Sequence, residues 1–213
     1  MRHEGHQVWG THRSEFNFEL DPFPATPCEV LLLNTPPLKN ISPKDFVQKV
    51  SDHPAKRVIF ISSTSVYGEV DGQVNELTPV NPVTASAKWL TDVESLLHVQ
   101  FNTRLTVIRP GGLIGGDRHP SKSLAGKTAV PNGQHPVNLI HRDDLIQLIR
   151  NTKLSLINAV APTHTRKDLY YSQWATKLGL AVPTFTTELS QGKEVRSLYL
   201  DDFEWTHAQL DRL

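Results

Sequence analysis

A regular alternation of apolar runs and amphipathic stretches between Cys28 and Gly179 constrains the fold more than any other feature of this sequence. The runs "CEVLLLN", "RVIFIS", "RLTVIRP" and "LSLINAV" have the length and composition of buried strands. The stretches "SPKDFVQKVSDH", "SAKWLTDVESLLHV" and "DDLIQLIRNT" carry apolar residues at helical spacing. Strands that alternate with helices predict a mostly parallel sheet covered on both faces, so we expect an α/β, Rossmann-like, doubly wound fold.

Local signals place the ends of several elements. Ser42 is the expected N-cap of the first helix, with Pro43 at its first position, and Thr165 is the expected N-cap of the last helix, which Gly179 ends. The continuous run "CEVLLLN" predicts a strand buried on both faces. Residues 6–11 and the alternating "EFNFEL" predict two earlier strands, and the tail after residue 193 predicts a strand followed by a short helix.

Bulk composition excludes several classes of protein. Lys plus Arg and Asp plus Glu are both 22, so the formal charge is zero and nothing favours nucleic acid as a partner. One cysteine, Cys28, excludes an internal disulfide, and no apolar run is long enough to span a membrane. We therefore expect a cytoplasmic protein of one domain over residues 1–213, with about residues 111–213 forming the substrate-side loops and C-terminal elements.

The strand in "RVIFISSTSVYG" ends in a cluster of hydroxyl side chains, from Ser62 to Ser65. In doubly wound folds the chemistry lies at the carboxyl ends of the strands, which is where this cluster falls. Taken alone, the hydroxyls could be only a polar strand end; the interpretation as the substrate edge of an enzyme depends on Lys88 and on the ordered motifs described next. A hydrolase built on Ser63 is disfavoured, because the strand end is not a G-x-S-x-G elbow.

Four motifs occur in a fixed order, "FISSTSVYG", "NPVTASAKWL", "VIRPGGLIGG" and "NLIHRDDL". Together they resemble the extended short-chain dehydrogenase/reductase family, also called the NAD-dependent epimerase/dehydratase family, and most of all its atypical members. The resemblance implies that Ser63 hydrogen-bonds the substrate oxygen and that Lys88 binds the nicotinamide ribose. The family's catalytic tyrosine, four residues before the lysine, is replaced here by Thr84.

This replacement changes the chemistry that the site can perform. A phenol has a pKa near 10, which a neighbouring ammonium can bring towards neutrality, whereas an aliphatic hydroxyl ionises several units higher. We therefore expect Thr84 to bind substrate without acting as a proton shuttle. Tyr67 is the alternative phenol, although its position in the family is a packing and turn residue. His119, His135 and His141 are alternative proton donors, since they fall near the expected substrate loops.

The resemblance also implies a set of cofactor contacts: Arg13, Asn34, Thr35, Ser62, Lys88, Arg109, Pro110 and Gly111. A basic residue at Arg13, where NAD-binding members carry an acid, favours NADP over NAD. The family's Gly-rich strand–turn–helix is absent from the N-terminal residues "RHEGHQVWGTHRS". We expect an N-terminally truncated chain, in which strands near Val8 and Leu32 pair directly or leave edges open; a sheet closed in another way is the alternative.

Two other groups of residues carry side chains that could form a site. His3, His6 and His12 do not have the H-E-x-x-H spacing, so no metal site is expected. Asp143 or its neighbour is expected to cap a helix instead of acting as an acid or base. The sequence therefore predicts an NAD(P)-dependent epimerase/dehydratase- or reductase-like protein with weak or no activity. It would act on a small molecule such as a nucleotide sugar or ketone, and could be a homodimer. The alternative is a non-catalytic NAD(P)-binding or scaffold protein.

Overall fold

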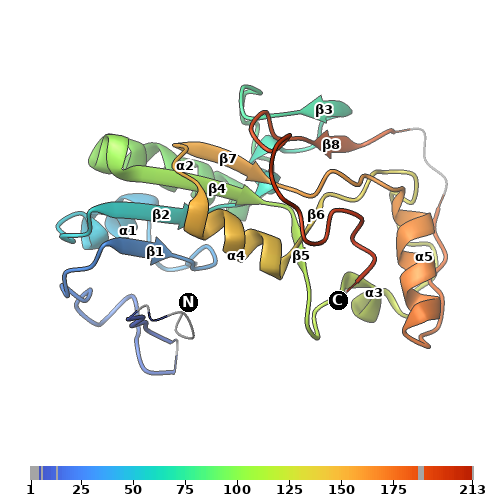
Figure 1. Cartoon of the computed structure of the whole chain (residues 1–213), viewed down its shortest axis with the longest axis horizontal. Coiled ribbons are helices and arrows are strands. Elements are labelled where there is room, and N and C mark those ends of the chain that lie inside the picture. Colours follow the sequence, from blue (N-terminus) through green and yellow to red (C-terminus); the bar gives the residue numbers. More distant parts are fainter. Residues whose placement is uncertain (1–4, 6, 13, 187–189, 213) are drawn as a thin grey trace.

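Four parallel strands form the central sheet of the protein. The computed structural model describes residues 5, 7–12, 14–186 and 190–212. The strands are β1 (Val30–Leu33), β2 (Arg57–Ile61), β4 (Leu105–Pro110) and β7 (Leu156–Ala159), in the order β1-β2-β4-β7 (Figure 1). Helices connect them, as parallel neighbours require. The predicted α/β, Rossmann-like fold is confirmed.

Helices cover both faces of this sheet. On one face lie α1 (Pro43–Val50) and α2 (Ala85–Phe101), which contact each other, and on the other lies α4 (Arg142–Asn151). Beyond the carboxyl ends of the strands, α3 (Pro120–Leu124) packs against α5 (Lys167–Lys177), as the right side of Figure 1 shows. Short 3₁₀ turns, η2 (Thr64–Tyr67) and η3 (Asn102–Arg104), follow β2 and α2.

Two small parallel sheets lie outside the central one. The first pairs β3 (Gly72–Val74) with β8 (Lys193–Val195), and the second pairs β5 (Gly112–Ile114) with β6 (Leu139–His141). Both therefore join segments that are far apart in the sequence. The β3–β8 pair brings the C-terminal part of the chain back beside the segment that follows η2 (Figure 1).

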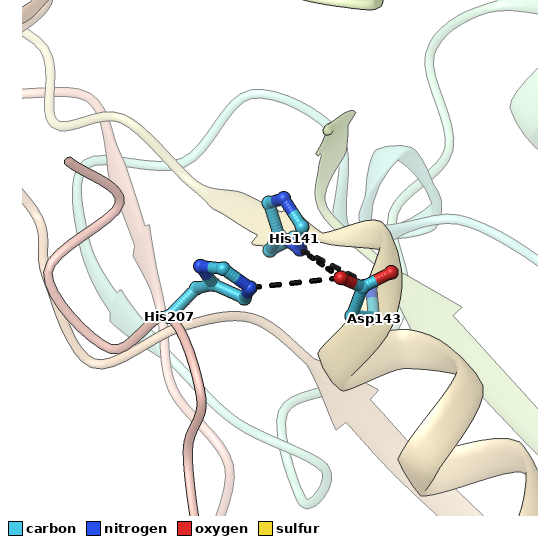
Figure 2. A group of neighbouring side chains, drawn as sticks. All are labelled: His141, Asp143 and His207. Atoms are coloured by element: carbon cyan, nitrogen blue, oxygen red, sulfur yellow. Dashed lines mark hydrogen bonds and ion pairs between the residues drawn. The ribbon is translucent and has the colours of Figure 1, made fainter. Parts of the chain in front are cut away.

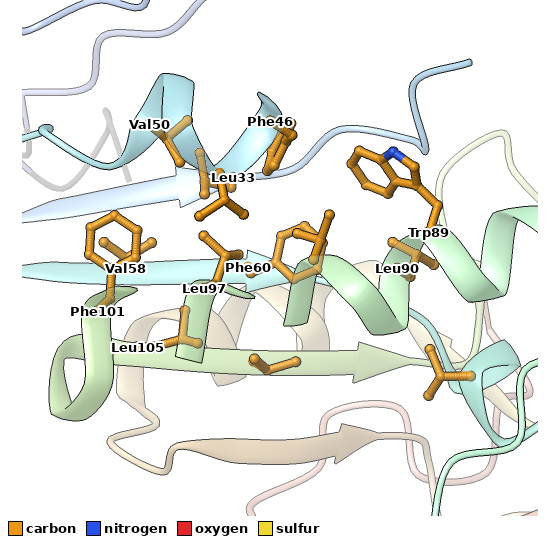
Figure 3. Close-up of a cluster of buried hydrophobic side chains, with 14 of the residues drawn as sticks. Leu33, Phe46, Val50, Val58, Phe60, Trp89, Leu90, Leu97, Phe101 and Leu105 are labelled. Carbon is orange, nitrogen blue, oxygen red and sulfur yellow. The ribbon is translucent and has the colours of Figure 1, made fainter. Parts of the chain in front are cut away.

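The period-2 alternation of the strands divides the core into two layers. In β2, Val58 and Phe60 point towards α1 and α2, whereas Ile59 packs with Ile108 and Ile157 on the α4 side. Figure 3 shows the first layer, where α1 and α2 contribute Phe46, Val50, Trp89, Leu90, Leu97 and Phe101. Burying each large apolar side chain contributes about 1.5–3 kcal/mol, so these layers hold the helices in place.

Helix ends agree with the sequence predictions in part. Ser42 accepts a hydrogen bond from the Asp45 N–H at 3.1 Å and Pro43 begins α1, as predicted. Gly179, with φ +65°, follows the last turn of α5, also as predicted. The prediction for Thr165 was wrong, because the N-cap position of α5 is Arg166 and no side chain caps it.

The N-terminal predictions fail in an informative way. Residues 7–12 and 14–20 contain no strand. The alternating aromatics form a cluster instead: Phe18 stacks on Phe46 of α1 with ring centroids 4.9 Å apart, and contacts Phe16 and Phe23. Packing against α1 buries part of these rings without a neighbouring strand, so the period-2 pattern does not lead to a strand here.

Strand β1 is also more exposed than predicted. Val30 and Leu32 are 44% and 41% exposed, so the expectation of burial on both faces was wrong. Within the described residues β1 pairs only with β2, which leaves its other edge open, one of the two outcomes expected above. In the tail the expected strand is β8, but residues 196–212 form turns and bends instead of the predicted short helix.

Candidate functional site

The hydroxyl cluster after β2 divides into a buried and an accessible part. Ser62 is buried and its Oγ donates to a carboxylate oxygen of Glu94 on α2. Ser63 is half-buried, and its Oγ accepts only the Ser65 N–H at 3.1 Å, so the hydroxyl proton stays available. Successive strand residues point to opposite sides, which separates the two serines.

Ser62 belongs to a buried polar network that the sequence reasoning missed. The Glu94 carboxylate accepts hydrogen bonds from the Arg109 guanidinium: Arg109 Nη2 lies 2.6 Å and Arg109 Nε 3.1 Å from the carboxylate oxygens. Arg109 Nη1 donates to the Tyr67 hydroxyl at 3.0 Å, and that hydroxyl donates to Asn158 Oδ1 at 2.9 Å. All five side chains are at most 9% exposed. A buried charge is stable only when it is paired in this way, so the network ties β2, β4, β7 and α2 together.

Thr84 and Lys88 lie at the start of α2, beside the turn that carries Ser63. Thr84 is the N-cap of α2 and its Oγ1 accepts the Ala87 N–H at 3.1 Å. Lys88 is exposed, one turn further along the helix. The loop before α2 is joined to η2 by the Asn81 N–H, which donates to the Val66 carbonyl at 2.9 Å. A Cβ on Gly68 would lie 2.0 Å from the Asn81 carbonyl oxygen, so only glycine permits this approach.

Two of the alternative proton donors, Tyr67 and His119, are held in buried positions. Tyr67 is fully buried, and burial raises its pKa although Arg109 opposes the shift. His119 is 4% exposed, and burial lowers its pKa to about 4. It caps α3 and its Nε2 lies 3.3 Å from the Tyr170 hydroxyl, inside an aromatic cluster with Trp174. Both residues therefore support the fold and are poorly placed to exchange protons with a substrate.

The structure places the remaining predicted cofactor residues as follows. Asn34 and Thr35 follow β1 and are exposed and half-buried, respectively. Pro110 ends β4, and a Cβ on Gly111 would lie 2.4 Å from the Asn138 carbonyl oxygen, so this backbone needs glycine to approach β6. The guanidinium of Arg109 is occupied by Glu94 and Tyr67. Arg13 lies outside the described residues.

A cavity of about 270 Å³ lies on the C-terminal side of η2. Its lining includes Gly112, Asn138, His135, Tyr171, Lys167 and Lys193. Lys193 Nζ donates to the carbonyls of Thr64, at 3.1 Å, and Gly68, at 2.6 Å, which fixes the turn that carries Ser63. Burial lowers the pKa of Lys193. Two lysines and a histidine around one cavity suit an anionic ligand.

His141, predicted as an alternative proton donor, lies in a different group of side chains. Its ring caps α4 by accepting the Asp143 N–H at 3.2 Å, so the cap is His141 and the prediction of Asp143 or its neighbour was wrong. His207 from the tail stacks on His141, with ring centroids 3.6 Å apart (Figure 2). No sequence pattern indicated this pairing, because the tail segment lacks a regular element. No described helix is long and apolar enough to cross a membrane.

Fold and strand-end residues together define the class of this protein. It has a Rossmann-like fold, and Ser63, Thr84 and Lys88 lie at the strand end and helix start where the resemblance places the family's serine, tyrosine and lysine. Solved structures named as NAD-dependent epimerase/dehydratase proteins share this fold, which agrees with the resemblance seen in the sequence.

Comparison with individual proteins places it more closely. No family model matches the chain. It is 41% identical to Protein YeeZ of Escherichia coli over 155 residues, which are 70% of this chain and 56% of that protein. This chain thus spans little more than half the length of that relative.

Two solved structures show the same fold. One, from Methylobacillus flagellatus, is provisionally assigned as an NAD-dependent epimerase/dehydratase and is 26% identical, with a TM-score of 0.56 over 72% of this chain and 59% of that one. The other is the UDP-glucuronic acid 4-epimerase of Bacillus cereus in complex with NAD. It is 19% identical, with a TM-score of 0.58 over 73% of this chain and 56% of that one.

Proposed function

We propose that the chain functions as an NAD(P)-dependent epimerase/dehydratase- or reductase-like protein whose proton-transfer step is weak or absent. The observation that supports this most strongly is the arrangement at the carboxyl end of β2. Ser63 and Lys88 remain accessible on adjoining elements, while the one phenol of the turn, Tyr67, is buried and hydrogen-bonded.

The residues at this edge fit the nicotinamide end of such a cofactor. A bound nicotinamide nucleotide would supply the hydride or accept it. The exposed ammonium of Lys88 would donate to the ribose hydroxyls, and Asn34 and Thr35 would line the cofactor at the end of β1. Ser63 would donate its hydroxyl proton to the substrate oxygen, because its lone pair already accepts the Ser65 N–H. A Gly-rich cradle for the pyrophosphate does not occur among the described residues.

The substrate side of the proposal rests on the cavity next to η2. Lys167, Lys193 and His135 would favour an anionic small molecule, and a nucleotide sugar has the required charge. The Bacillus cereus epimerase, which has the same fold, is named for such a substrate. A preference for NADP over NAD is proposed from Arg13 alone.

The alternative is a protein that binds the nucleotide without catalysis. It is favoured by one specific observation: Tyr67 and His119, two of the titratable rings considered as proton donors, are committed to buried contacts. Thr84 cannot replace them, since an aliphatic hydroxyl does not ionise near neutral pH.

A fluorescence titration of NADPH and NADH against the purified chain tests the proposal. We expect saturable binding that weakens about tenfold in Lys88→Ala, because a charge-assisted hydrogen bond to the ribose contributes about 1.5 kcal/mol. Lys44→Ala is the matched control, since Lys44 is exposed on α1, and it should bind as the parent does. Identical binding of the parent and Lys88→Ala would contradict the assigned role of Lys88.

A further inference from the structure

Three side chains with metal-binding chemistry converge where the C-terminal tail crosses the start of α4. His141 ends β6, Asp143 lies in the first turn of α4, and His207 belongs to the tail. Figure 2 shows both imidazoles directing one nitrogen towards the Asp143 carboxylate. His141 Nδ1 and His207 Nε2 each lie 3.7 Å from the same oxygen, Asp143 Oδ2.

These distances are too long for hydrogen bonds and close to the spacing of ligands around one ion. A nitrogen–oxygen hydrogen bond spans about 2.7–3.2 Å. Ligands held about 2.0–2.1 Å from a tetrahedral zinc ion are spaced roughly 3.3 Å apart. The three ligand atoms lie within 4.8 Å of one another, so small rotations of the side chains would close the set around an ion.

The backbone holds His207 in this position before any ion binds. The buried carboxylate of Asp144 accepts the N–H groups of Thr206, at 2.8 Å, and of His207, at 3.1 Å. His141 is only 1% exposed, and a Cβ on Gly115 would lie 2.7 Å from its Nε2, so the ring has a fixed place. Two of the three ligands are therefore preorganised, which lowers the entropic cost of binding.

The polar groups around the three side chains determine what an ion would have to displace. Arg142 Nε lies 3.4 Å from Asp143 Oδ1, the oxygen that does not face the histidines. The Asp143 side chain is half-exposed, which provides an entry path and room for a water ligand. His141 Nδ1 accepts the Asp143 N–H at 3.2 Å, and an ion would displace this bond. The far nitrogens, His141 Nε2 and His207 Nδ1, are buried without a hydrogen-bond partner among the described residues.

We propose that His141, Asp143 and His207 form a site for a divalent transition-metal ion of the zinc class, which ties the C-terminal tail to α4. Two imidazoles and one carboxylate suit zinc, cobalt or nickel better than magnesium or calcium, which prefer all-oxygen ligands. Three protein ligands leave a fourth position for water. The site is independent of the proposed nucleotide function.

The test is a titration of Zn²⁺ into the full chain after treatment with a chelator. His3, His6 and His12 are replaced by Gln throughout, which removes the other histidine-rich stretch. We expect one ion per chain, and a loss of at least about tenfold in affinity in Asp143→Asn and in His207→Gln. His98→Gln, an exposed histidine on α2, is the matched control and should bind as its parent does.

A second readout distinguishes this site from any other. Co²⁺ in place of Zn²⁺ should give a visible absorption band that Asp143→Asn removes. Asp143→Asn should fold, because the Asp143 side chain is half-exposed and the helix cap uses only the Asp143 backbone N–H. This variant therefore tests the metal site even if His207→Gln unfolds. Absence of saturable binding, or equal binding in the parent and in Asp143→Asn, would overturn the proposal.

Discussion

Ser62 and Ser63 are neighbours in the sequence, yet they face two different parts of the molecule. The side chain of Ser62 enters the buried network of Glu94, Arg109, Tyr67 and Asn158, where every polar group has a partner. The side chain of Ser63 stays on an accessible edge with Thr84 and Lys88. The buried network holds the strands in place, whereas the side chains of the edge are accessible to a ligand.

The two serines thus separate side chains that stability requires from side chains whose chemistry can change without loss of the fold. A buried network cannot lose one member without leaving a charge or a dipole unpaired, so its residues are fixed by stability. At the accessible edge the constraint is weaker: Thr84, which the resemblance places at the family's tyrosine position, is exposed and makes a capping bond to the Ala87 N–H. Stability and chemistry are therefore assigned to separate residues at the end of one strand.

The largest expected effect comes from removing the charge at the centre of the network. Arg109→Met leaves the Glu94 carboxylate buried and unpaired, and we expect a loss of about 3–5 kcal/mol in the free energy of unfolding. Urea denaturation measures it. Lys56→Met is the control, since the Lys56–Glu29 pair is about three-quarters exposed on both sides and should contribute less than about 1 kcal/mol. Equal losses in the two variants would remove the distinction between the buried and accessible parts.

A pH effect should follow from another buried polar group, His119. Its pKa is about 4 in the folded chain against 6.5 for an ordinary histidine, so the unfolded chain takes up the proton first. The free energy of unfolding is therefore unaffected by this group well above pH 6.5. It falls as the pH is lowered, and the loss reaches roughly 3 kcal/mol at about pH 4. Urea denaturation at pH 7 and pH 5 should show a smaller difference for His119→Gln than for the parent. His98→Gln, which is exposed, should behave as the parent does; an unchanged pH difference in His119→Gln would contradict the assignment.

The smallest effect compares the two serines directly. Ser62→Ala removes a donor from the buried Glu94 carboxylate and should cost about 1–3 kcal/mol. Ser63→Ala should cost only about 0.5 kcal/mol, because the Ser65 N–H that it frees can bond to water. Thermal unfolding of both variants measures the difference. A larger loss in Ser63→Ala would show that the hydroxyl cluster has been divided wrongly.

The strands, helices and caps that depend on local pattern could be predicted from the sequence. The run around Ile59 and the spacing of Leu90 and Leu97 each specify one element, because burial at a fixed period leaves few alternatives. The alternation of Phe16 and Phe18 was misleading, since aromatic packing against α1 gives the same pattern as a strand.

The buried polar network and the metal-site cluster could not be predicted. Glu94 and Arg109 come from α2 and β4, and only the tertiary packing of these elements brings them together. His207 reaches His141 through a tail segment without regular structure, held by hydrogen bonds from its own backbone to Asp144. Local periodicity contains no information about such contacts.

Turnover of nicotinamide nucleotide by Thr84→Tyr tests the central claim most directly. The account holds that the accessible edge keeps the serine and lysine of the family and lacks only the phenol. NADPH oxidation should therefore be very slow in the parent with ketone or keto-sugar nucleotide substrates, whose carbonyl accepts the hydride, and should rise in Thr84→Tyr by about 100-fold, the lower range for general acid/base catalysis. Thr84→Phe, which adds the ring without the hydroxyl, should stay at the level of the parent. Fast turnover by the parent that Thr84→Val leaves unchanged would contradict the account.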